Sequence, residues 1–260
     1  MVRIVALLTD FGAMDPYVGA MKGAILSVCP EATLVDLAHE VPPHDVLAGA
    51  LTLHAACHTF PAGTVFVAVV DPGVGSPRRG LALRAGPHLF VGPDNGLFSF
   101  VLREHPQARI HGLENSRLFR SPVSPVFHGR DVFGPVAGHL AQGVGLGEVG
   151  PKVEDPVLLE APEPRKLATG EWEAAVLYVD RFGNLTTSLS ERAVEGARTV
   201  EVWVGGATIP WVGTYSEVRP GTPCALVGSS GRLEVAVREG SASARLGVGK
   251  GSPVRVRVVW

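Results

Sequence analysis

Cysteine is scarce in this sequence, with only Cys29, Cys57 and Cys224 among 260 residues. The three lie far apart and match neither the spacing of a zinc site nor that of a redox pair. The histidines likewise lack the HExxH arrangement, and because they are scattered over helix-like and loop-like patterns we predict no metal site from them. We therefore expect a protein without a metal, in the reducing environment of the cytoplasm.

Long apolar runs and a strong net charge are also missing. No stretch of about 18 apolar residues occurs, and the run in MVRIVALLTDFG reaches Asp10 too soon for a secretory signal. The formal net charge of -2 at pH 7 gives no electrostatic reason to bind nucleic acid or an anionic membrane. Since 46% of the residues are hydrophobic, enough for a sizeable core, we expect a soluble globular protein.

Residues 1–150 alternate between strand-like and helix-like segments. Continuous apolar or β-branched runs, typical of strands buried on both faces, are RIVALLTD, TLVDLA, TVFVAVVD and HLFVGP. Between them, DPYVGAMKGAILSVCP and HDVLAGALTLHAACHTFP have apolar residues at helical spacing and end at a proline. PDNGLFSFVLREHP repeats this plan, with Asp94 or Asn95 as its N-cap. The alternation predicts an α/β domain with a mostly parallel sheet.

The second half of the chain has a different pattern. Residues 151–168 are rich in proline and charge and show no period, which predicts a linker. Residues 169–260 contain short strand-like runs at close spacing, separated by turns such as VGGA and GSSG. This pattern is typical of a small antiparallel barrel or sandwich, and we expect a C-terminal antiparallel β-barrel domain.

Asp10 and Asp71 each end an apolar strand of the first domain and precede a turn that contains glycine. Ligands of open α/β sheets bind outside the carboxyl ends of the strands, so the two acids are candidates for one pocket. The alternative is that each merely caps the turn or helix that follows.

A phosphate-binding loop is the first interpretation of GVGSPRRG, but the context is wrong. Such a loop needs a helix directly after its glycines, whereas Pro77 follows here and LALRA is strand-like. We expect the glycines either to let the backbone pass close to a ligand or to adopt positive φ. The arginines would pair with a carboxylate, either a ligand's or that of Asp71. An exposed hairpin with solvated arginines is the alternative.

Three further stretches carry polar candidates. His128 lies in a loop directly before a helix that starts near Asp131. YVDRFGNLTTSL has a carboxylate, an aromatic ring and an amide in one tight connection, and LVGSSGRLEVAV has two serines in a possible carboxylate nest. Ordinary hairpin turns would explain both connections as well. The candidates in these two connections are Asp180, Phe182, Asn184, Ser229 and Ser230.

Five motifs occur together in order: LLTDFG, VDPGVGS followed by two arginines, FHGRDVF, VDRFGNLTT and VGSSGRLEVAV. Together they resemble the S-adenosyl-L-methionine (SAM) hydroxide adenosyltransferase family, the SAM hydrolases, which are related to the fluorinases and chlorinases. The resemblance covers nearly the whole chain. It implies an α/β domain followed by a β-barrel, a homotrimer, and SAM bound between the first domain of one subunit and the second domain of its neighbour.

Carried over residue by residue, the resemblance implies a catalytic set of Asp71, Arg78 and His128, with Arg79 as a less favoured substitute for Arg78. His44 stands where the halogenases carry a tryptophan. The implied substrate contacts are Asp10 to the ribose hydroxyls, Asp180 to the methionine amino group, Asn184 to the nucleoside, Ser229 and Ser230 to the methionine carboxylate, and Tyr215, by position alone, to the adenine ring.

The implied reaction is attack of water or hydroxide on C5′ of the SAM ribose, which yields adenosine and L-methionine without a metal or other cofactor. The halogenases lack the aspartate and histidine of the catalytic set and carry an extra loop, so a halogenase of the same fold is a disfavoured alternative. A SAM-binding sensor without turnover and an unrelated nucleotide-binding module are the others. The retained catalytic set speaks against the sensor, and the missing phosphate loop against the module.

Overall fold

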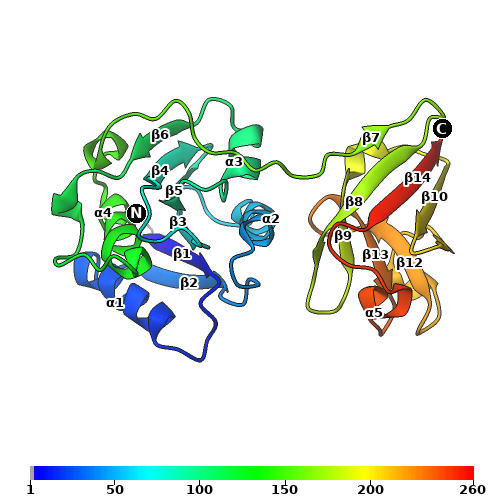
Figure 1. Cartoon of the computed structure of the whole chain (residues 1–260), viewed down its shortest axis with the longest axis horizontal. Helices are drawn as coiled ribbons and strands as arrows, with labels where there is room; N and C mark the ends of the chain where they lie inside the picture. The colour runs from blue at the N-terminus through cyan, green and yellow to red at the C-terminus, as the bar shows by residue number, and fades with distance from the viewer. Residues whose placement is uncertain (1–2) are drawn as a thin grey trace. The chain divides into compact units, whose positions relative to one another are not determined.

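The computed structural model describes residues 3–260. The chain divides into two compact units, Met1–Leu159 and Glu160–Trp260, hereafter the N-terminal and C-terminal units (Figure 1). Among the residues that the structure describes, no helix is long and apolar enough to cross a membrane.

A six-stranded sheet forms the centre of the N-terminal unit, with strand order β2-β1-β3-β5-β4-β6. β2, β1, β3 and β5 pair in parallel, and β4 is antiparallel to both β5 and β6. All strands except β4 therefore run in one direction, which confirms the α/β fold with a mostly parallel sheet. The bounds are Ile4–Thr9 (β1), Thr33–Ala38 (β2), Val65–Val69 (β3), Gly80–Ala85 (β4), His88–Pro93 (β5) and Arg109–Gly112 (β6).

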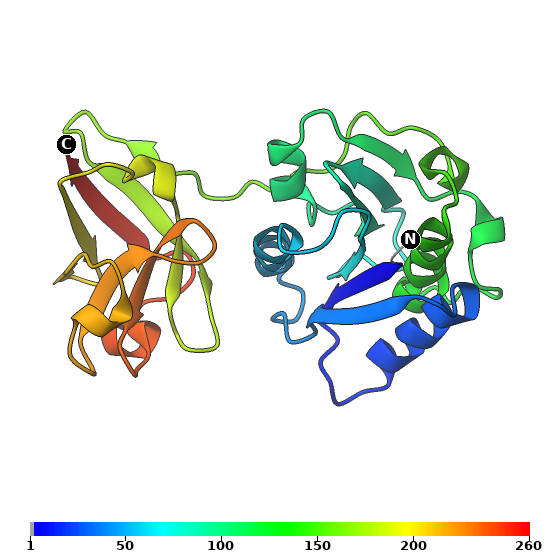
Figure 2. The same ribbon diagram turned by 180° about the vertical axis from the view of Figure 1, so that it is seen from behind.

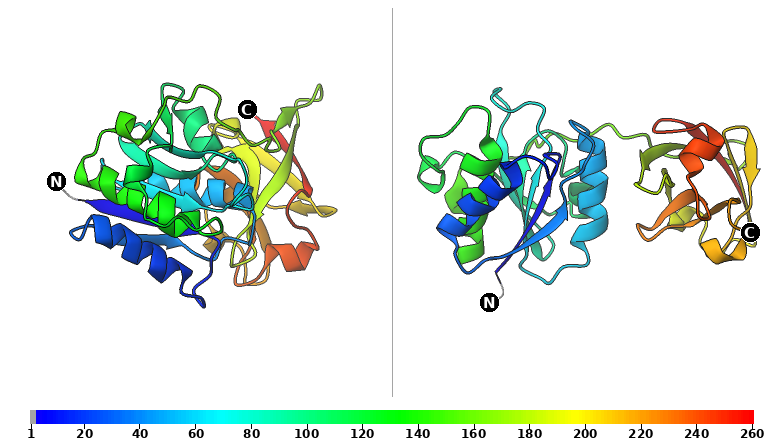
Figure 3. Two further views of the ribbon diagram at one scale, coloured as in Figure 1. Left: turned by 60° about the vertical axis from the view of Figure 1, so that its left-hand side comes forward. Right: turned by 90° about the horizontal axis from the view of Figure 1, so that it is seen from below.

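Helices cover both faces of this sheet. α1 (Tyr17–Val28) and α4 (Gly134–Gln142) pack together on one face, while α2 (Val46–Cys57) covers the other, in contact with α3 (Ser99–Glu104) (Figure 3). Because both faces are covered, every residue of β3 is buried, which explains its unbroken apolar sequence.

The predicted start of α3 is wrong. Asp94 or Asn95 was expected to cap this helix, but the helix begins only at Ser99. Asp94 instead binds the Arg79 side chain, and the Asn95 side chain donates a hydrogen bond to the carbonyl of Val70 at 2.8 Å. These tertiary hydrogen bonds hold the two side chains away from the helix terminus, so local capping preference does not decide the boundary.

Residues 151–159 run along the N-terminal unit as an extended segment. The Val153 N–H donates to the carbonyl of Ile110 at 2.9 Å, and the Leu159 N–H donates to Oγ of Ser99 at 2.7 Å. The sequence predicts a linker over 151–168; these hydrogen bonds attach its first part to the N-terminal unit, and the division between the units lies after Leu159.

The C-terminal unit is an antiparallel sheet that is nearly closed (Figure 2). Its strand order is β11-β10-β14-β8-β9-β13-β12, with β7 paired to β8. A bridge between Trp211 and Ala225 brings the chain after β11 to β12. This arrangement confirms the expected antiparallel barrel. The bounds are Arg165–Lys166 (β7), Trp172–Val179 (β8), Leu185–Ser190 (β9), Thr199–Val204 (β10), Ala207–Ile209 (β11), Pro223–Val227 (β12), Arg232–Val237 (β13) and Pro253–Val259 (β14), with one α-helix, Ala242–Leu246 (α5), and two 3-10 turns, Glu191–Ala193 and Tyr215–Glu217.

The barrel strands alternate between inward apolar and outward polar residues. In β14, Val254 and Val256 are buried in the core, whereas Arg255 and Arg257 are exposed. This period of two is typical of an antiparallel sheet with one face in the core and one face in water.

Candidate active site

Asp10 and Asp71 follow neighbouring parallel strands. β1 and β3 are in register with Thr9 opposite Val69, so both acids leave the sheet at its carboxyl edge. This edge is where open α/β sheets bind ligands. The fold therefore brings the two strand-ending acids to one side of the N-terminal unit.

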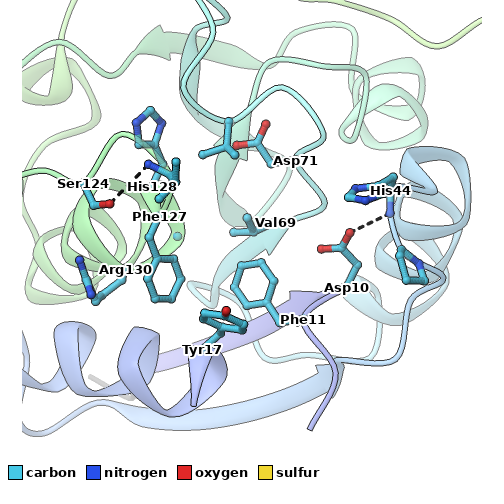
Figure 4. Close-up of a pocket in the computed structure, with 14 residues that line it drawn as sticks. Asp10, Phe11, Tyr17, His44, Val69, Asp71, Ser124, Phe127, His128 and Arg130 are labelled. Carbon is cyan, nitrogen blue, oxygen red and sulfur yellow. Dashed lines mark hydrogen bonds between the residues drawn. The ribbon is translucent and has the colours of Figure 1, made fainter. Parts of the chain in front are cut away.

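A cavity of about 640 Å³ opens at this edge (Figure 4). Carboxylate, imidazole, guanidinium and aromatic groups share its wall, which an apolar residue of β3, Val69, completes in the centre. The lining includes Asp10, Phe11, Tyr17, His44, Asp71, Ser124, Phe127, His128 and Arg130. Such a concave, mixed surface suits a small ligand with both polar and apolar parts.

Asp71, Arg78 and His128 form one hydrogen-bonded set. Arg78 donates to both carboxylate oxygens of Asp71, from Nε to Oδ1 at 2.9 Å and from Nη2 to Oδ2 at 2.5 Å. The same Nη2 lies 2.7 Å from Nδ1 of His128. The Asp71 and Arg78 side chains are only 5% and 11% exposed, so this two-pronged pair is shielded from solvent and fixed in geometry.

The contact with Arg78 determines which nitrogen of His128 carries the proton. A guanidinium can only donate, so Nδ1 accepts and the neutral imidazole has its N–H at Nε2. Burial lowers the pKa of His128, and the positive charge of Arg78 lowers it further, although Asp71 and Asp131 act in the opposite direction. His128 is therefore neutral at pH 7.

Arg79 points to a different part of the molecule. Its Nε donates to Oδ2 of Asp94 at 2.8 Å, and its Nη1 and Nη2 donate to the side chain and the backbone carbonyl of Asp155, each at 2.8 Å. Arg78 and not Arg79 is thus the arginine beside Asp71. Arg79 instead fastens the extended segment 151–159 to the sheet.

Gly75 lets the loop after Asp71 pack against the loop that carries His128. Its φ is +78°, and a Cβ at this position would lie 2.7 Å from the carbonyl oxygen of Pro125. Only glycine meets both requirements without strain. The glycine-rich stretch therefore brings two loops of the pocket together and does not wrap a phosphate.

Asp131 anchors the chain on either side of His128. It is completely buried, within a short π-helical turn, Gly129–Phe133, that leads into α4. Burial alone would raise the pKa of Asp131, but hydrogen bonds from the Arg130 side chain and the Ser124 N–H outweigh it and leave the pKa below its usual value. The buried carboxylate thus holds both ends of the segment 124–131.

Asp10 is held by the backbone of the loop before α2. Its Oδ2 accepts a hydrogen bond from the His44 N–H at 2.9 Å (Figure 4). His44 has a φ of 66°, a left-handed conformation that is uncommon outside glycine. The contact is made by the His44 backbone, while its imidazole lines the cavity.

An aromatic cluster in the cavity wall was missed by sequence reasoning. Phe11, Tyr17 and Phe127 contact one another edge to face, with ring centroids 5.4 to 6.1 Å apart, and the Arg130 guanidinium lies 4.9 Å from the centre of the Phe127 ring. Phe11 and Phe127 directly follow or precede residues that were identified, Asp10 and His128. That adjacency, in DFG and FHG, was the signal available.

In the C-terminal unit, Asp180 organises the turn between β8 and β9. Its Oδ1 accepts hydrogen bonds from the backbone N–H groups of Phe182 and Asn184, and its Oδ2 accepts one from Nδ2 of Asn184. Phe182 is 75% exposed at the tip. The turn therefore has an exposed aromatic ring and a carboxylate that accepts hydrogen bonds from the backbone of the turn itself.

Tyr215 contacts an acid that the sequence did not single out, Glu234. The Tyr215 hydroxyl donates to Oε1 of Glu234 at 2.6 Å. Burial raises the pKa of Glu234, and the charge of Asp180 raises it further against the hydrogen bond from Tyr215. The isolated acid within the apolar run LEVAV was the available signal. Ser229 and Ser230 are exposed in the turn between β12 and β13.

The predicted site residues thus fall into two groups. Asp10, Asp71, Arg78 and His128 lie together in the N-terminal unit. The second group, all in the C-terminal unit, is Asp180, Phe182, Asn184, Tyr215, Ser229 and Ser230.

Comparison with known proteins identifies the family. The chain is 44% identical to an (R)-S-adenosyl-L-methionine hydrolase of Thermus thermophilus, over 98% of this chain and 99% of the relative. It is 29% identical to a fluorinase of Actinoplanes over 90% of each chain. A solved structure of an uncharacterized conserved protein from Thermotoga maritima matches with a TM-score of 0.90 and 34% identity, over 97% of this chain and 99% of that one.

Both units match family descriptions. Residues 5–150 match the SAM hydroxide adenosyltransferase N-terminal domain, and residues 174–255 match the corresponding C-terminal domain. The resemblance inferred from the five motifs is thereby confirmed, and the chain belongs to the SAM hydroxide adenosyltransferase family.

Proposed function

We propose that this protein hydrolyses SAM to adenosine and L-methionine by attack of water at C5′ of the ribose. The observation that carries the proposal is the shielded hydrogen-bonded set of Asp71, Arg78 and His128, in which Asp71 and His128 line the cavity and Arg78 holds both. A relative that is 44% identical over nearly the whole chain is named an (R)-S-adenosyl-L-methionine hydrolase. The arrangement suits a reaction in which a water molecule must be oriented and deprotonated.

In the proposed reaction, the water oxygen forms a bond to C5′ while the bond from C5′ to sulfur breaks. Sulfur keeps the electron pair and leaves as the neutral thioether of methionine, so no acid is needed to protonate it. Asp71 accepts the water proton, and His128 donates from Nε2 to orient the oxygen. Arg78 holds both residues in place, and the proton then passes to solvent.

The surroundings favour this step over the same step in water. Attack by an oxygen nucleophile on a sulfonium destroys charge, which a dry, preorganised site promotes. The aromatic cluster of Phe11, Tyr17 and Phe127 supplies an apolar wall near the acids. Asp10 is assigned to the ribose hydroxyls, and alignment of oxygen, C5′ and sulfur contributes the remaining acceleration.

The second group of residues is assigned to the rest of SAM. Asp180 would bind the methionine ammonium and Asn184 the nucleoside. Tyr215 and Phe182 would contact the aromatic part, and Ser229 and Ser230 the methionine carboxylate. We propose a homotrimer in which the C-terminal unit of one subunit completes the site of its neighbour, since such head-to-tail contacts close into a ring.

The reaction needs neither a metal nor another cofactor, because SAM carries its own activated leaving group. The proposal places the protein in the cytoplasm, where its three unpaired cysteines stay reduced.

One assay tests the function. The protein is incubated with SAM in ¹⁸O-labelled water, with and without chloride or fluoride. The products are separated by chromatography and identified by mass spectrometry. Equal amounts of adenosine labelled at its 5′ oxygen and of methionine are expected. A 5′-haloadenosine would establish the halogenase instead, and tight SAM binding without product would establish a sensor.

The assembly is tested by light scattering at the assay concentration. A trimer mass is expected. A monomer with full SAM turnover would contradict the shared site and leave the hydrolase activity standing.

A further inference from the structure

His54, His58 and Glu104 converge at one place on the surface of the N-terminal unit. The Nε2 atoms of His54 and His58 lie 3.0 and 3.3 Å from the same carboxylate oxygen, Oε2 of Glu104. One ligand atom from each residue lies within 4.8 Å of the others. This cluster, hereafter the His-His-Glu cluster, has no part in the proposed hydrolysis.

We propose that the His-His-Glu cluster binds a divalent transition metal of the zinc class. Metal–ligand bonds of about 2.1 Å place neighbouring ligand atoms about 3.0 to 3.4 Å apart, as octahedral or tetrahedral coordination requires. The two nitrogen–oxygen distances match this spacing. Two imidazoles and a carboxylate are a donor set suited to Zn²⁺, Co²⁺ or Ni²⁺, and water would complete the coordination on the exposed side.

The fold positions the two imidazoles before any ion arrives. His54 lies in the last turn of α2 and His58 four residues later, so both project from one side of the helix. Their rings contact edge to face at 5.1 Å, and the His54 ring lies 5.9 Å from the ring of buried Phe100. These contacts restrict the rotamers and reduce the entropy lost on binding.

Two electrostatic features favour a cation here. The carboxyl end of α2 carries the negative end of the helix dipole, and Glu104 adds a full negative charge. Cys57 stays outside the ligand set, because its thiol is buried and donates to the His54 carbonyl.

The cluster is remote from the cavity at the carboxyl edge. α2 starts beside the His44 loop, and its 12 residues span about 18 Å to the end that carries the cluster. Because Glu104 is the last residue of α3, a bound ion would connect α2 to α3. We therefore expect the metal to stabilise the fold without changing SAM turnover.

The test uses the full chain without a histidine tag, stripped of metal by a chelator. Calorimetric titration with Co²⁺ should show one ion bound per chain, and Zn²⁺ should displace it. Binding should weaken by at least about tenfold in each of His54→Ala, His58→Ala and Glu104→Gln. Removing a residue that only supports a metal ligand already costs about that much, so removing a ligand should cost no less. His139→Gln, in α4, is the matched control and should bind like the parent.

Melting curves supply a second readout. Zn²⁺ should raise the melting temperature of the parent chain but not that of His58→Ala, because only a ligand that binds the folded state stabilises it. If the cluster is merely hydrogen-bonded, calorimetry shows no uptake of Co²⁺ by the stripped chain, and the metal site is refuted. Equal Co²⁺ affinity in the three variants would refute it as well. SAM turnover, measured in parallel, reports separately on the proposed hydrolase.

Discussion

Nη2 of Arg78 lies 2.7 Å from Nδ1 of His128, and the same nitrogen donates to Asp71. One guanidinium therefore fixes both the base candidate and the tautomer of the imidazole. The three side chains come from two loops that are 50 residues apart in sequence, and they behave as a single unit. Their individual roles can be separated by substitutions that keep shape and change one property.

Asp71→Asn keeps the shape of the side chain and removes the negative acceptor. We expect turnover to fall by about 10² to 10⁴, the usual span for a positioned acid–base group. SAM affinity should change little, because Asp71 is assigned to water. Single-turnover formation of adenosine and calorimetric SAM binding separate the two effects, with Asp36→Asn, at an exposed position of β2, as control. Lost affinity with an intact chemical step would make Asp71 a substrate ligand.

His128 predicts the pH dependence of turnover. Its pKa is lowered by burial and by Arg78, so the imidazole stays neutral at pH 7 and gains a proton only below its usual 6.5. The protonated ring loses the acceptor at Nδ1 and repels Arg78. We expect kcat to be constant from pH 8 to about 6.5 and to decline at lower pH. A decline that begins above pH 7 would contradict this assignment.

Asp10→Ala tests whether Asp10 binds substrate or only shapes the turn. A carboxylate on two ribose hydroxyls contributes about 1.5 to 3 kcal/mol per charged hydrogen bond, so the dissociation constant of SAM should rise at least about tenfold. Asp10→Asn, which keeps an acceptor for the His44 N–H, separates the two roles. If both variants bind SAM like the parent, Asp10 is a turn residue alone.

The sequence predicts the site residues that follow the ends of strands. It does not predict the residues whose position depends on tertiary contacts. Asp10 and Asp71 could be placed at one edge because buried parallel strands have unmistakable apolar runs. The choice between Arg78 and Arg79 could not be derived from residue type or spacing. Side chains of neighbouring residues in extended chain point opposite ways, and a distant acid, Asp155, binds Arg79.

The C-terminal unit shows the same limit. Its antiparallel strands were recognised from their alternation. Glu234 was not identified as a site residue, because in β13 it occupies a position where the alternation predicts an ordinary polar residue facing away from the core. Tyr215 lies in a short 3-10 turn and Glu234 in β13, so only the fold brings the Tyr215 hydroxyl within 2.6 Å of the Glu234 carboxylate.

Gly75→Ala should destabilise the pocket by more than the backbone strain of an alanine at positive φ. The added Cβ would meet the Pro125 carbonyl at 2.7 Å, in addition to the cost of a φ of +78°. Gly63→Ala is the matched control, since Gly63 has a φ of +87° with nothing within 4 Å of its Cβ. We expect Gly75→Ala to lower both the melting temperature and kcat further than Gly63→Ala. Equal effects would show that the two loops do not depend on close contact.

His88 predicts how stability depends on pH. The side chain is in the core beside Phe66 and Phe90, and burial, followed by the charges of His58 and His105, lowers the pKa of His88. As the pH falls, the His88 imidazole is therefore protonated in the unfolded chain at a higher pH than in the folded chain. Stability should decrease once the pH falls through about 6.5, by up to about 1.4 kcal/mol per pH unit, until the folded-state pKa is reached.

His88→Leu replaces the titratable imidazole with an apolar side chain of similar size. Urea unfolding of both chains, at pH 7.5 and 5.5 and with a chelator present, measures the difference. The parent should lose more free energy of unfolding between the two pH values than the variant does. The same loss in both would mean that other groups, such as the buried carboxylate of Asp131, set the acid stability.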